Sequence, residues 1–306
     1  MRYGYINPCA DFACLCFAYR YTEAMSRPLR IDFSGAIHHV TARGNGYAPI
    51  FLGDGDRHEF LRVLSDCIKR FGWVCHAYCL MGNHYHLMIE TPIANMSDGM
   101  RHLNGCYTQW FNWQHDRVGH IFQGRFKSIL VDRDAYLLEL CRYIVLNPVR
   151  ARMVAHVSAY WWSSYCATSG SAPAPHWLHR EWLLAQFDDD LPLARGKYVE
   201  FVARGLGGPS PLDCVKDQVL LGPDDFVSAM RPRIEGKRDT PGVASAQRFA
   251  YRPELAALLA QAGTVGKPAR DELIRRAHLD FRYSKSDIAR AAGLHRSTVG
   301  KIIQCR

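Results

Sequence analysis

The 306-residue sequence lacks three features that would each settle its class. It has no apolar run long enough to cross a membrane, so we expect no membrane partner. Its start lacks the basic region and small-residue cleavage site of a secretory signal. Its eleven cysteines contain no CxxC pair, which argues against a disulfide scaffold or a zinc knuckle. The sequence therefore predicts a cytoplasmic protein with reduced thiols.

The charge balance favours a polyanionic partner. The formal net charge is +9, and residues 265–306 hold ten Lys and Arg against four Asp and Glu. In a protein without a membrane anchor, such an excess is typical of nucleic-acid binding. Solubility alone is the competing explanation.

Periodicity predicts an α+β domain followed by an all-helical domain. Strands are expected at 36–43, 73–81, 84–90 and 125–131, and helices at 56–71, 96–111 and 134–147. A capping box at Asp56 would begin the first helix, and Pro148 would stop the last one. The order β-α-β-β-α-β is the ferredoxin-like arrangement. We expect residues 166–245 to be a connector with helices, which includes a charged linker from Pro232 to Gly242, and residues 246–306 to be an all-α domain.

The run His84-Tyr85-His86 lies on the third predicted strand. Side chains alternate between the faces of a strand, so His84 and His86 share one face and Tyr85 points into the core on the other. The two imidazoles would lie about 7 Å apart along the strand. Two neutral imidazoles so placed can hold one divalent ion. Two partly exposed histidines without a function are the alternative.

The last helix of the predicted α+β domain carries Tyr143 and Asn147 one turn apart. A phenol beside a metal site can attack a phosphodiester and form a covalent phosphotyrosine. The amide oxygen of Asn147 can add a metal ligand. Tyr136, seven residues earlier on roughly the same face, is the competing nucleophile, and a core tyrosine is the alternative for Tyr143.

Four ordered motifs carry a family resemblance. They are Arg43-Gly44-Asn45, Met81-Gly82-Asn83-His84-Tyr85-His86-Leu87, His120-Ile121-Phe122-Gln123-Gly124-Arg125-Phe126-Lys127 and Tyr143-Ile144-Val145-Leu146-Asn147-Pro148. Together they resemble the Y1 transposases of IS200-like elements in the HUH superfamily, and most of all the REP-associated tyrosine transposases. The resemblance covers residues 25–165, with Met25 at the family's usual start. We therefore expect residues 1–24 to be a non-functional N-terminal extension, which leaves Met1 and Met25 as alternative starts.

The resemblance implies a role for each position that matches a motif. His84 and His86 would be the metal ligands, with Mg²⁺ or Mn²⁺ as the cofactor, and Tyr143 the nucleophile. Asn147 stands where the insertion-sequence branch has a Gln ligand, one methylene longer. The implied reaction cleaves single-stranded DNA at a hairpin, leaving a 5′-phosphotyrosine and a free 3′-hydroxyl.

Two further regions predict DNA contacts. In the first, Arg125 and Lys127 flank Phe126 on the fourth strand, and the aromatic residues Trp110, Phe111 and Trp113 precede them. Cations beside aromatic rings suit single strands, where phosphates pair with the cations and bases stack on the rings. Arg43 and Asn45 of the first motif join this predicted surface. The alternative is that Trp110 and Phe111 belong to the core.

The second region, residues 284–303, has the pattern of a helix, a glycine turn and a second helix. It resembles a helix-turn-helix, and more loosely the DNA-binding domain of replication initiators of the DnaA type. The start of its second helix would present four polar or basic side chains to duplex DNA: Arg296, Ser297, Thr298 and Lys301. A plain helical hairpin is the alternative.

The sequence thus favours a metal-dependent enzyme that cleaves and transfers single-stranded DNA through a tyrosine. A regulator without catalysis, which binds DNA through the helix-turn-helix, is the rival hypothesis. A zinc-dependent hydrolase built on His84 and His86 is a third, without a clear third ligand. A monomer and a homodimer both stay open.

Overall fold

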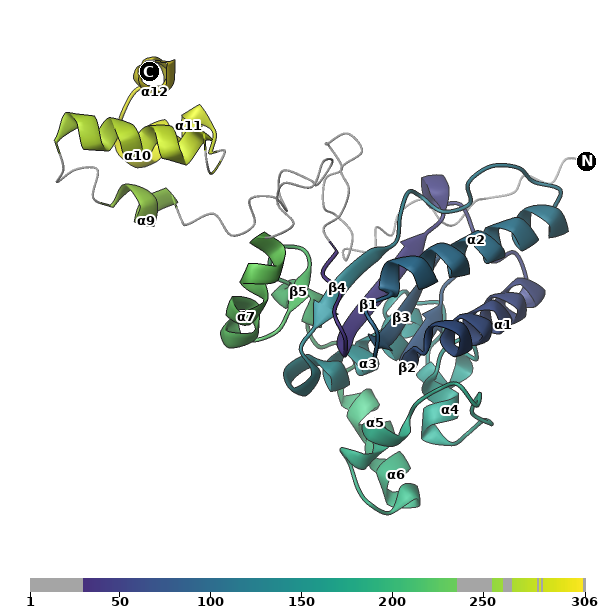
Figure 1. The fold of residues 1–306 in the computed structure, drawn as a ribbon. Coiled ribbons are helices and arrows are strands. Elements are labelled where there is room, and N and C mark those ends of the chain that lie inside the picture. Colours follow the sequence, from purple (N-terminus) through teal and green to yellow (C-terminus); the bar gives the residue numbers. More distant parts are fainter. Residues whose placement is uncertain (1–29, 236–254, 261–265, 280, 282, 305–306) are drawn as a thin grey trace, which may run out of the picture. The chain divides into compact units, whose positions relative to one another are not determined.

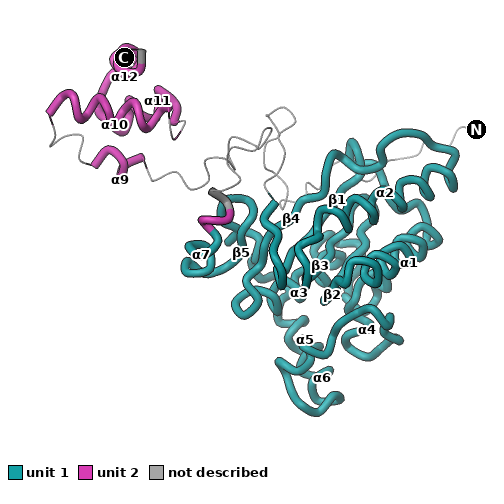
Figure 2. The backbone as a smooth tube through the Cα atoms, viewed as in Figure 1, with its two compact units in different colours: residues 1–22, 30–230 teal, residues 23–29, 231–306 magenta. Residues whose placement is uncertain are grey.

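The computed structural model describes residues 30–235, 255–260, 266–279, 281 and 283–304. The chain divides into two compact units, drawn in two colours in Figure 2. Residues 30–230 make up the described part of the first unit, and the described residues from 231 onward belong to the second. The predicted boundaries of the extension, residues 1–24, lie outside the described residues.

The first unit contains a five-stranded sheet in the order β2-β3-β1-β4-β5 (Figure 1). The strands are β1 (Ala36–Arg43), β2 (Val74–Leu80), β3 (His84–Thr91), β4 (Lys127–Val131) and β5 (Leu220–Leu221). Helix α1 (Asp54–Phe71) separates β1 from β2, and α2 (Met96–Gln114) separates β3 from β4. The first four strands pair antiparallel, while β5 pairs parallel with β4. The predicted β-α-β-β-α-β order is therefore present, and β5 is an addition that the sequence did not indicate.

The first helix begins two residues earlier than predicted. Gly53 precedes α1, and Asp56 is its third residue instead of its cap. The Asp56 carboxylate accepts hydrogen bonds from the backbone N–H groups of Leu52 and Gly53, at 2.5 and 3.1 Å. An acidic side chain at this position reaches back to donors that have no partner in the helix. The helix ends at Phe71, as predicted, and Gly72 after it adopts the left-handed conformation with φ 66°.

Helix α3 (Arg133–Arg150) continues through Pro148, where the sequence predicted a stop. Proline has no N–H, so the Ile144 carbonyl loses its backbone donor. The side-chain amide of Asn147 takes over part of this role. Its Nδ2 donates to the Tyr143 carbonyl at 3.0 Å and to the Ile144 carbonyl at 3.4 Å. The helix therefore tolerates a proline in its last turn.

Helices cover both faces of the sheet. Helices α1 and α2 lie along one face, where Phe60, Leu87 and Tyr107 belong to a large apolar core. Helix α3 lies on the other face, where Met88 and Ile144 belong to a second core. Successive residues of β3 therefore alternate between two buried environments, as strand geometry requires.

The chain from the end of α3 to residue 230 completes the first unit. The loop at Trp162–Ser164 runs beside β2, where the Leu80 N–H donates to the Trp162 carbonyl at 2.8 Å. Four helices follow: α4 (Tyr165–Ser169), α5 (Glu181–Ala185), α6 (Leu191–Arg204) and α7 (Asp224–Glu235). Leu183, Tyr198 and Val202 of α5 and α6 join the core beneath α3. The linker was predicted from Pro232 to Gly242, but its first residues belong to α7, and residues 236–242 lie outside the described residues. A proline near the end of a helix removes only one backbone hydrogen bond, so the helix continues past Pro232.

The described part of the second unit is helical. Its helices are α9 (Leu255–Leu259), α10 (Lys267–Leu279), α11 (Lys285–Ala292) and α12 (Arg296–Gln304). Ile274, Ile288 and Val299 form its core. The Ser284 hydroxyl caps α11 by accepting from the Asp287 N–H at 3.0 Å, and Gly293 ends that helix with φ 63°. Among all the described helices, none is both long and apolar enough to span a bilayer.

Candidate active site

The two histidines of β3 lie together on the face that α3 covers. The centroids of the His84 and His86 rings are 5.0 Å apart. Tyr85, between them, points to the opposite core, where it is fully buried and its hydroxyl donates to Asn104 Oδ1 at 2.6 Å. Strand alternation therefore separates the tyrosine of this run from its two imidazoles.

Both imidazoles are held in the neutral form. Burial lowers the pKa of His84 to about 4, with a further contribution from the charge of Arg43. Burial also lowers the pKa of His86 well below its ordinary value, and His84 adds to the effect. A neutral imidazole keeps a lone pair for a metal ion at neutral pH. His84 is half-buried, while His86 is 2% exposed.

A third histidine, His39 of β1, joins the pair and was missed by the sequence analysis. Met88 lies directly opposite His39 in the β1–β3 pairing, so His86 is its diagonal neighbour on the same face. His39 Nε2 is 2.9 Å from His86 Nδ1. Burial lowers the pKa of His39 to about 3. Alternation along β1 determines on which face of the sheet His39 lies. Its contact with His86, however, depends on the register in which β1 pairs with β3.

Tyr143 reaches the same cluster from α3. Its ring centroid is 6.2 Å from that of His86 and 6.5 Å from that of His39, and both contacts are edge-on. The side chain is buried, at 2% exposed. Its competitor Tyr136 lies beside Cys214 instead, where burial and that thiol raise the pKa of the phenol. The tyrosine that the motif singles out is thus the one in contact with imidazoles.

The side chains of His84, His86 and Asn147 provide some, but not all, of the ligands that a divalent ion needs. His86 Nε2 is buried and has no hydrogen-bond partner among the described residues, as expected for an atom whose partner is a metal. Asn147 uses its amide nitrogen within α3, which leaves its Oδ1 as the atom available to a cation. The described residues contain no group of three His, Cys, Asp or Glu side chains suited to a metal. A metal at His84 and His86 would therefore need an amide, water or phosphate oxygen to complete its shell.

Two cations lie on the histidine side of the sheet. Arg43 is directly opposite His84 in the β1–β3 pairing, and Lys127 is opposite Thr41 in the β1–β4 pairing. Burial and the nearby charge of Arg43 lower the pKa of Lys127, so the two cations influence each other. The Arg43 guanidinium donates to Gln123 Oε1 at 2.6 Å. Positive charge therefore borders the half-buried end of the imidazole cluster.

Arg43 also lies over an exposed aromatic ring. Its Cζ is 3.9 Å from the centroid of Tyr47, which is 62% exposed. Tyr47 ends the short 3-10 helix Asn45–Tyr47 (η2), in which Asn45 is exposed. A cation stacked on an exposed ring is the combination that binds nucleobases. The motif Arg43-Gly44-Asn45 thus lies next to the imidazole cluster.

Arg125 and Lys127 belong to different surroundings, although the sequence placed them together on one strand. Strand β4 begins at Lys127, so Arg125 precedes it and does not share its alternation. Arg125 is close to Arg30, whose pKa falls to about 10 through burial and the charge of Arg125. Phe126, between the two cations, is buried beneath the Arg30 guanidinium at 3.8 Å.

The three aromatic residues of α2 divide between core and surface. Phe111 is fully buried, and Trp110 packs against the same core. Trp113 is 76% exposed. Only Trp113 of this group therefore has a free ring surface for a base.

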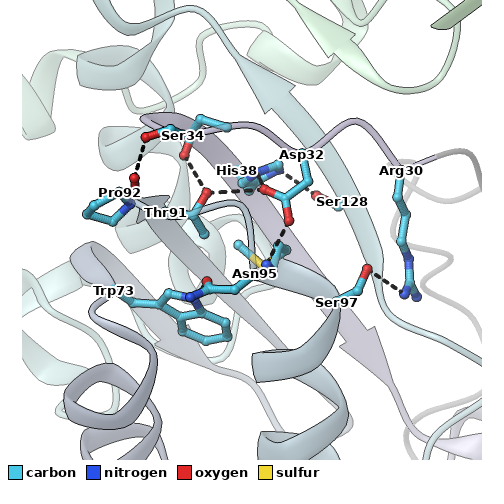
Figure 3. Close-up of polar contacts among 12 residues, drawn as sticks. Arg30, Asp32, Ser34, His38, Trp73, Thr91, Pro92, Asn95, Ser97 and Ser128 are labelled. Carbon is cyan, nitrogen blue, oxygen red and sulfur yellow. Dashed lines mark hydrogen bonds and ion pairs between the residues drawn. The ribbon is translucent and has the colours of Figure 1, made fainter. Parts of the chain in front are cut away.

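A second histidine of β1, His38, follows the alternation of the strand to the face opposite His39, where it lies near Asp32 and Ser128 (Figure 3). Its Nδ1 is 3.0 Å from Ser128 Oγ, and its Nε2 is 3.5 Å from Asp32 Oδ1. Asp32 also accepts from the Met96 N–H at 2.8 Å, at the start of α2. These contacts connect the segment before β1 to β4 and α2.

The residues predicted to contact duplex DNA lie on α12. Arg296, Ser297 and Thr298 occupy its first turn and Lys301 the next, and all four side chains are exposed. His295 precedes the helix, with its Nδ1 2.8 Å from Ser297 Oγ. Their exposure is compatible with the predicted contact, which stays a prediction.

Comparisons with known proteins place this site in context. Residues 33–147 match the family of IS200-like transposases. A solved structure described as a REP-associated tyrosine transposase bound to a REP hairpin is 17% identical, with a TM-score of 0.42. That match covers 51% of this chain and 92% of the other. None of the curated proteins matches the chain.

Proposed function

On the premise that residues 33–147 form a domain of the IS200-like transposase family, we propose that this chain cleaves and rejoins single-stranded DNA at hairpin repeats. The observation that carries the proposal is the contact of Tyr143 with two buried imidazoles, His39 and His86. A phenol held beside neutral imidazoles and bordered by cations suits attack on a phosphodiester.

The proposed metal ligands are His84, His86 and the amide oxygen of Asn147, for one Mg²⁺ or Mn²⁺. When bound, such an ion would polarise the scissile phosphate and offset its developing charge. The three side chains would leave room at such an ion for water and phosphate oxygens. This incomplete protein shell is what an ion that must also bind DNA requires.

The chain's own residues supply the nucleophile. In the proposed reaction, the Tyr143 hydroxyl loses its proton and its oxygen forms a bond to the scissile phosphorus. The bond from phosphorus to the 3′-oxygen breaks, and that oxygen takes up a proton to become a free 3′-hydroxyl. The 5′ end stays on Tyr143 as a phosphodiester, and attack by a 3′-hydroxyl reverses the step. Because Tyr143 is 2% exposed, entry of the strand must uncover its hydroxyl.

The residues around the imidazole cluster would bind the single-stranded DNA. Arg43 and Lys127 would pair with phosphates beside the metal, and Tyr47 would stack on a base, while Asn45 and Arg125 would extend the surface. The second unit would bind duplex DNA through a helix-turn-helix formed by α11 and α12. Arg296, Ser297, Thr298 and Lys301 would then make the contacts.

The covalent adduct tests the proposal. A hairpin-bearing single strand incubated with the chain and Mn²⁺ should give a DNA–protein adduct that survives a denaturing gel, and EDTA should abolish it. Tyr143→Phe should abolish the adduct but leave strand binding intact, because only the phenolic oxygen is lost. Tyr136→Phe is the matched control on the same helix and should react like the unmodified chain.

Two results would contradict the proposal in different ways. An adduct of normal yield in Tyr143→Phe would show that another residue is the nucleophile. Tight hairpin binding by the unmodified chain without any adduct would favour the rival hypothesis, a DNA-binding regulator without catalysis.

A further inference from the structure

We infer that His39 is a positioning residue, which accepts a hydrogen bond from His86 Nδ1–H and so directs the lone pair of His86 Nε2 to the metal. The inference rests on the proposed function, because it concerns how the proposed ligand His86 is held. Neither the family motifs nor the sequence analysis pointed to His39.

The hydrogen bond between the two imidazoles has favourable geometry. His39 Nε2 and His86 Nδ1 are 2.9 Å apart, and the two ring planes differ by only 5°. The ring centroids are 5.2 Å apart, close to the N–N distance plus the two ring radii. The rings therefore lie edge to edge in one plane, with the lone pair of one nitrogen directed at the N–H of the other. They are not stacked face to face.

Proton counting allows two arrangements of this pair. A neutral imidazole carries one N–H and one lone pair, so one ring donates and the other accepts. If His86 Nδ1 donates, His86 Nε2 carries a lone pair and can ligate a metal. If His39 Nε2 donates, the proton of His86 lies on Nε2 and blocks ligation. The direction of one hydrogen bond thus decides whether His86 can be a ligand.

Without a metal, the two arrangements satisfy the same number of hydrogen-bonding groups. The outer atoms of the pair, His39 Nδ1 and His86 Nε2, are both buried and have no hydrogen-bond partner among the described residues. Either arrangement leaves one of them as an unpaired donor and the other as an unpaired acceptor. A cation at His86 Nε2 favours the first arrangement, because only there does His86 Nε2 carry a lone pair that can bind it. Metal-ligating histidines typically donate their second N–H to a neighbouring acceptor in this way.

His39 is well placed to hold the ring of His86 still. Strand β1 is hydrogen-bonded to β3 on one side and to β4 on the other, and the His39 side chain is 1% exposed. Tyr143 contacts both rings edge-on. The orientation of the His86 ring therefore fixes the lone pair for the metal and also one wall of the space that Tyr143 occupies.

Calorimetric titration of the full chain with Mn²⁺ tests the inference. His39→Phe keeps a flat ring but has no acceptor, and we expect it to weaken Mn²⁺ binding about 10- to 100-fold. His39→Gln places an amide oxygen near the lost Nε2 and should recover most of the affinity. His38→Phe is the matched control, because His38 is a buried histidine on the same strand that bonds to Ser128 on the opposite face of the sheet (Figure 3).

The outcomes separate this inference from the proposed function. If folded His39→Phe binds Mn²⁺ as tightly as the unmodified chain, His39 is only a packing residue and the inference is wrong. The same holds if His38→Phe loses as much affinity as His39→Phe. If the unmodified chain binds no Mn²⁺, the proposed metal site itself fails. A missing covalent adduct together with normal Mn²⁺ binding contradicts only the proposed reaction.

A second measurement needs no variant, and it decides the matter should His39→Phe not fold. Long-range ¹H–¹⁵N spectra of the unmodified chain with saturating Mg²⁺ report which nitrogen of each histidine carries the proton. We expect His86 and His39 both to be protonated on Nδ1. A proton on His86 Nε2 under these conditions would overturn the inference.

Discussion

The two faces of the sheet are built from the same strands yet bury different polar groups. On the α1–α2 face, the buried phenol of Tyr85 donates to Asn104, and that of Tyr107 donates to the Ile50 carbonyl at 2.6 Å. On the α3 face, His39 and His86 each keep one buried nitrogen without a partner among the described residues. An unpaired buried polar atom destabilises a fold, so two of them on neighbouring imidazoles point to a role outside folding.

Neighbouring residues show how sharply the two faces are separated. His38 and His39 are adjacent in β1, but the first bonds to Ser128 and the second to His86. Tyr85 and His86 are adjacent in β3, but they lie in different cores. A shift of one residue in the strand register would exchange the faces. The comparison therefore predicts that changes on one face alter stability alone, while changes on the other alter stability and chemistry together.

The largest expected effect comes from opening a cavity in each face. Leu87→Ala and Met88→Ala remove adjacent side chains of β3 that are both fully buried, one from each core. Each should lower the free energy of unfolding by about 2–5 kcal/mol in urea denaturation. Only Met88→Ala should also weaken Mn²⁺ binding, because Met88 lies opposite His39 in the pairing of β1 with β3. Equal loss of Mn²⁺ affinity in both variants would remove the distinction between the faces.

Acid should destabilise the fold through the α3 face. Burial lowers the folded-state pKa of His39 to about 3 and that of His84 to about 4, while an unfolded histidine keeps a pKa near 6.5. Between these values the unfolded chain binds more protons, so stability is complete above about pH 6.5 and is lost as the pH falls below it. In EDTA, each such histidine should contribute a slope of about 1.4 kcal/mol per pH unit.

A variant isolates the contribution of one histidine to this slope. Urea denaturation of His39→Phe at several pH values between 4.5 and 6.5 should give a slope smaller by about 1.4 kcal/mol per pH unit. Leu87→Ala, on the other face, should shift the whole curve without changing its slope. An unchanged slope in His39→Phe would mean that His39 is protonated equally in the folded and unfolded states.

The smallest expected effect separates the structural and metal roles of Asn147. Asn147→Ala removes the donor to the Tyr143 and Ile144 carbonyls and should cost about 1 kcal/mol of stability. Adding Pro148→Ala restores a backbone N–H for Ile144, so the double variant should regain part of that loss in thermal unfolding. Mn²⁺ affinity should stay low in both variants if Asn147 Oδ1 is a ligand. Recovery of affinity in the double variant would show that Asn147 acts only through the helix.

Local patterns were enough to predict the strands and the separation of His84 and His86 from Tyr85. Strand β1 was predicted with the bounds that the structure gives, because alternation is a local signal. The contacts of His39 with His86 and of Arg43 with His84 depend on strand register, which no local pattern contains. Helix α3 ran past Pro148 because a side-chain amide replaced the missing donor, a compensation that propensity does not include. The pair Leu220–Leu221 is too short to show any alternation as β5.

The segment Trp162–Ser164 limits how copies of this chain can associate through the edge of the sheet. An exposed outer strand offers unpaired N–H and C=O groups that can recruit a strand from another molecule. Here the chain occupies part of that edge itself: Leu80 N–H bonds to the Trp162 carbonyl, and Ser164 N–H to the Tyr78 carbonyl at 3.0 Å. The Tyr160 hydroxyl also donates to the Leu80 carbonyl at 2.6 Å. The half of β2 next to the imidazole cluster is thereby closed to intermolecular strand addition, which protects this part of the sheet from aggregation at high concentration.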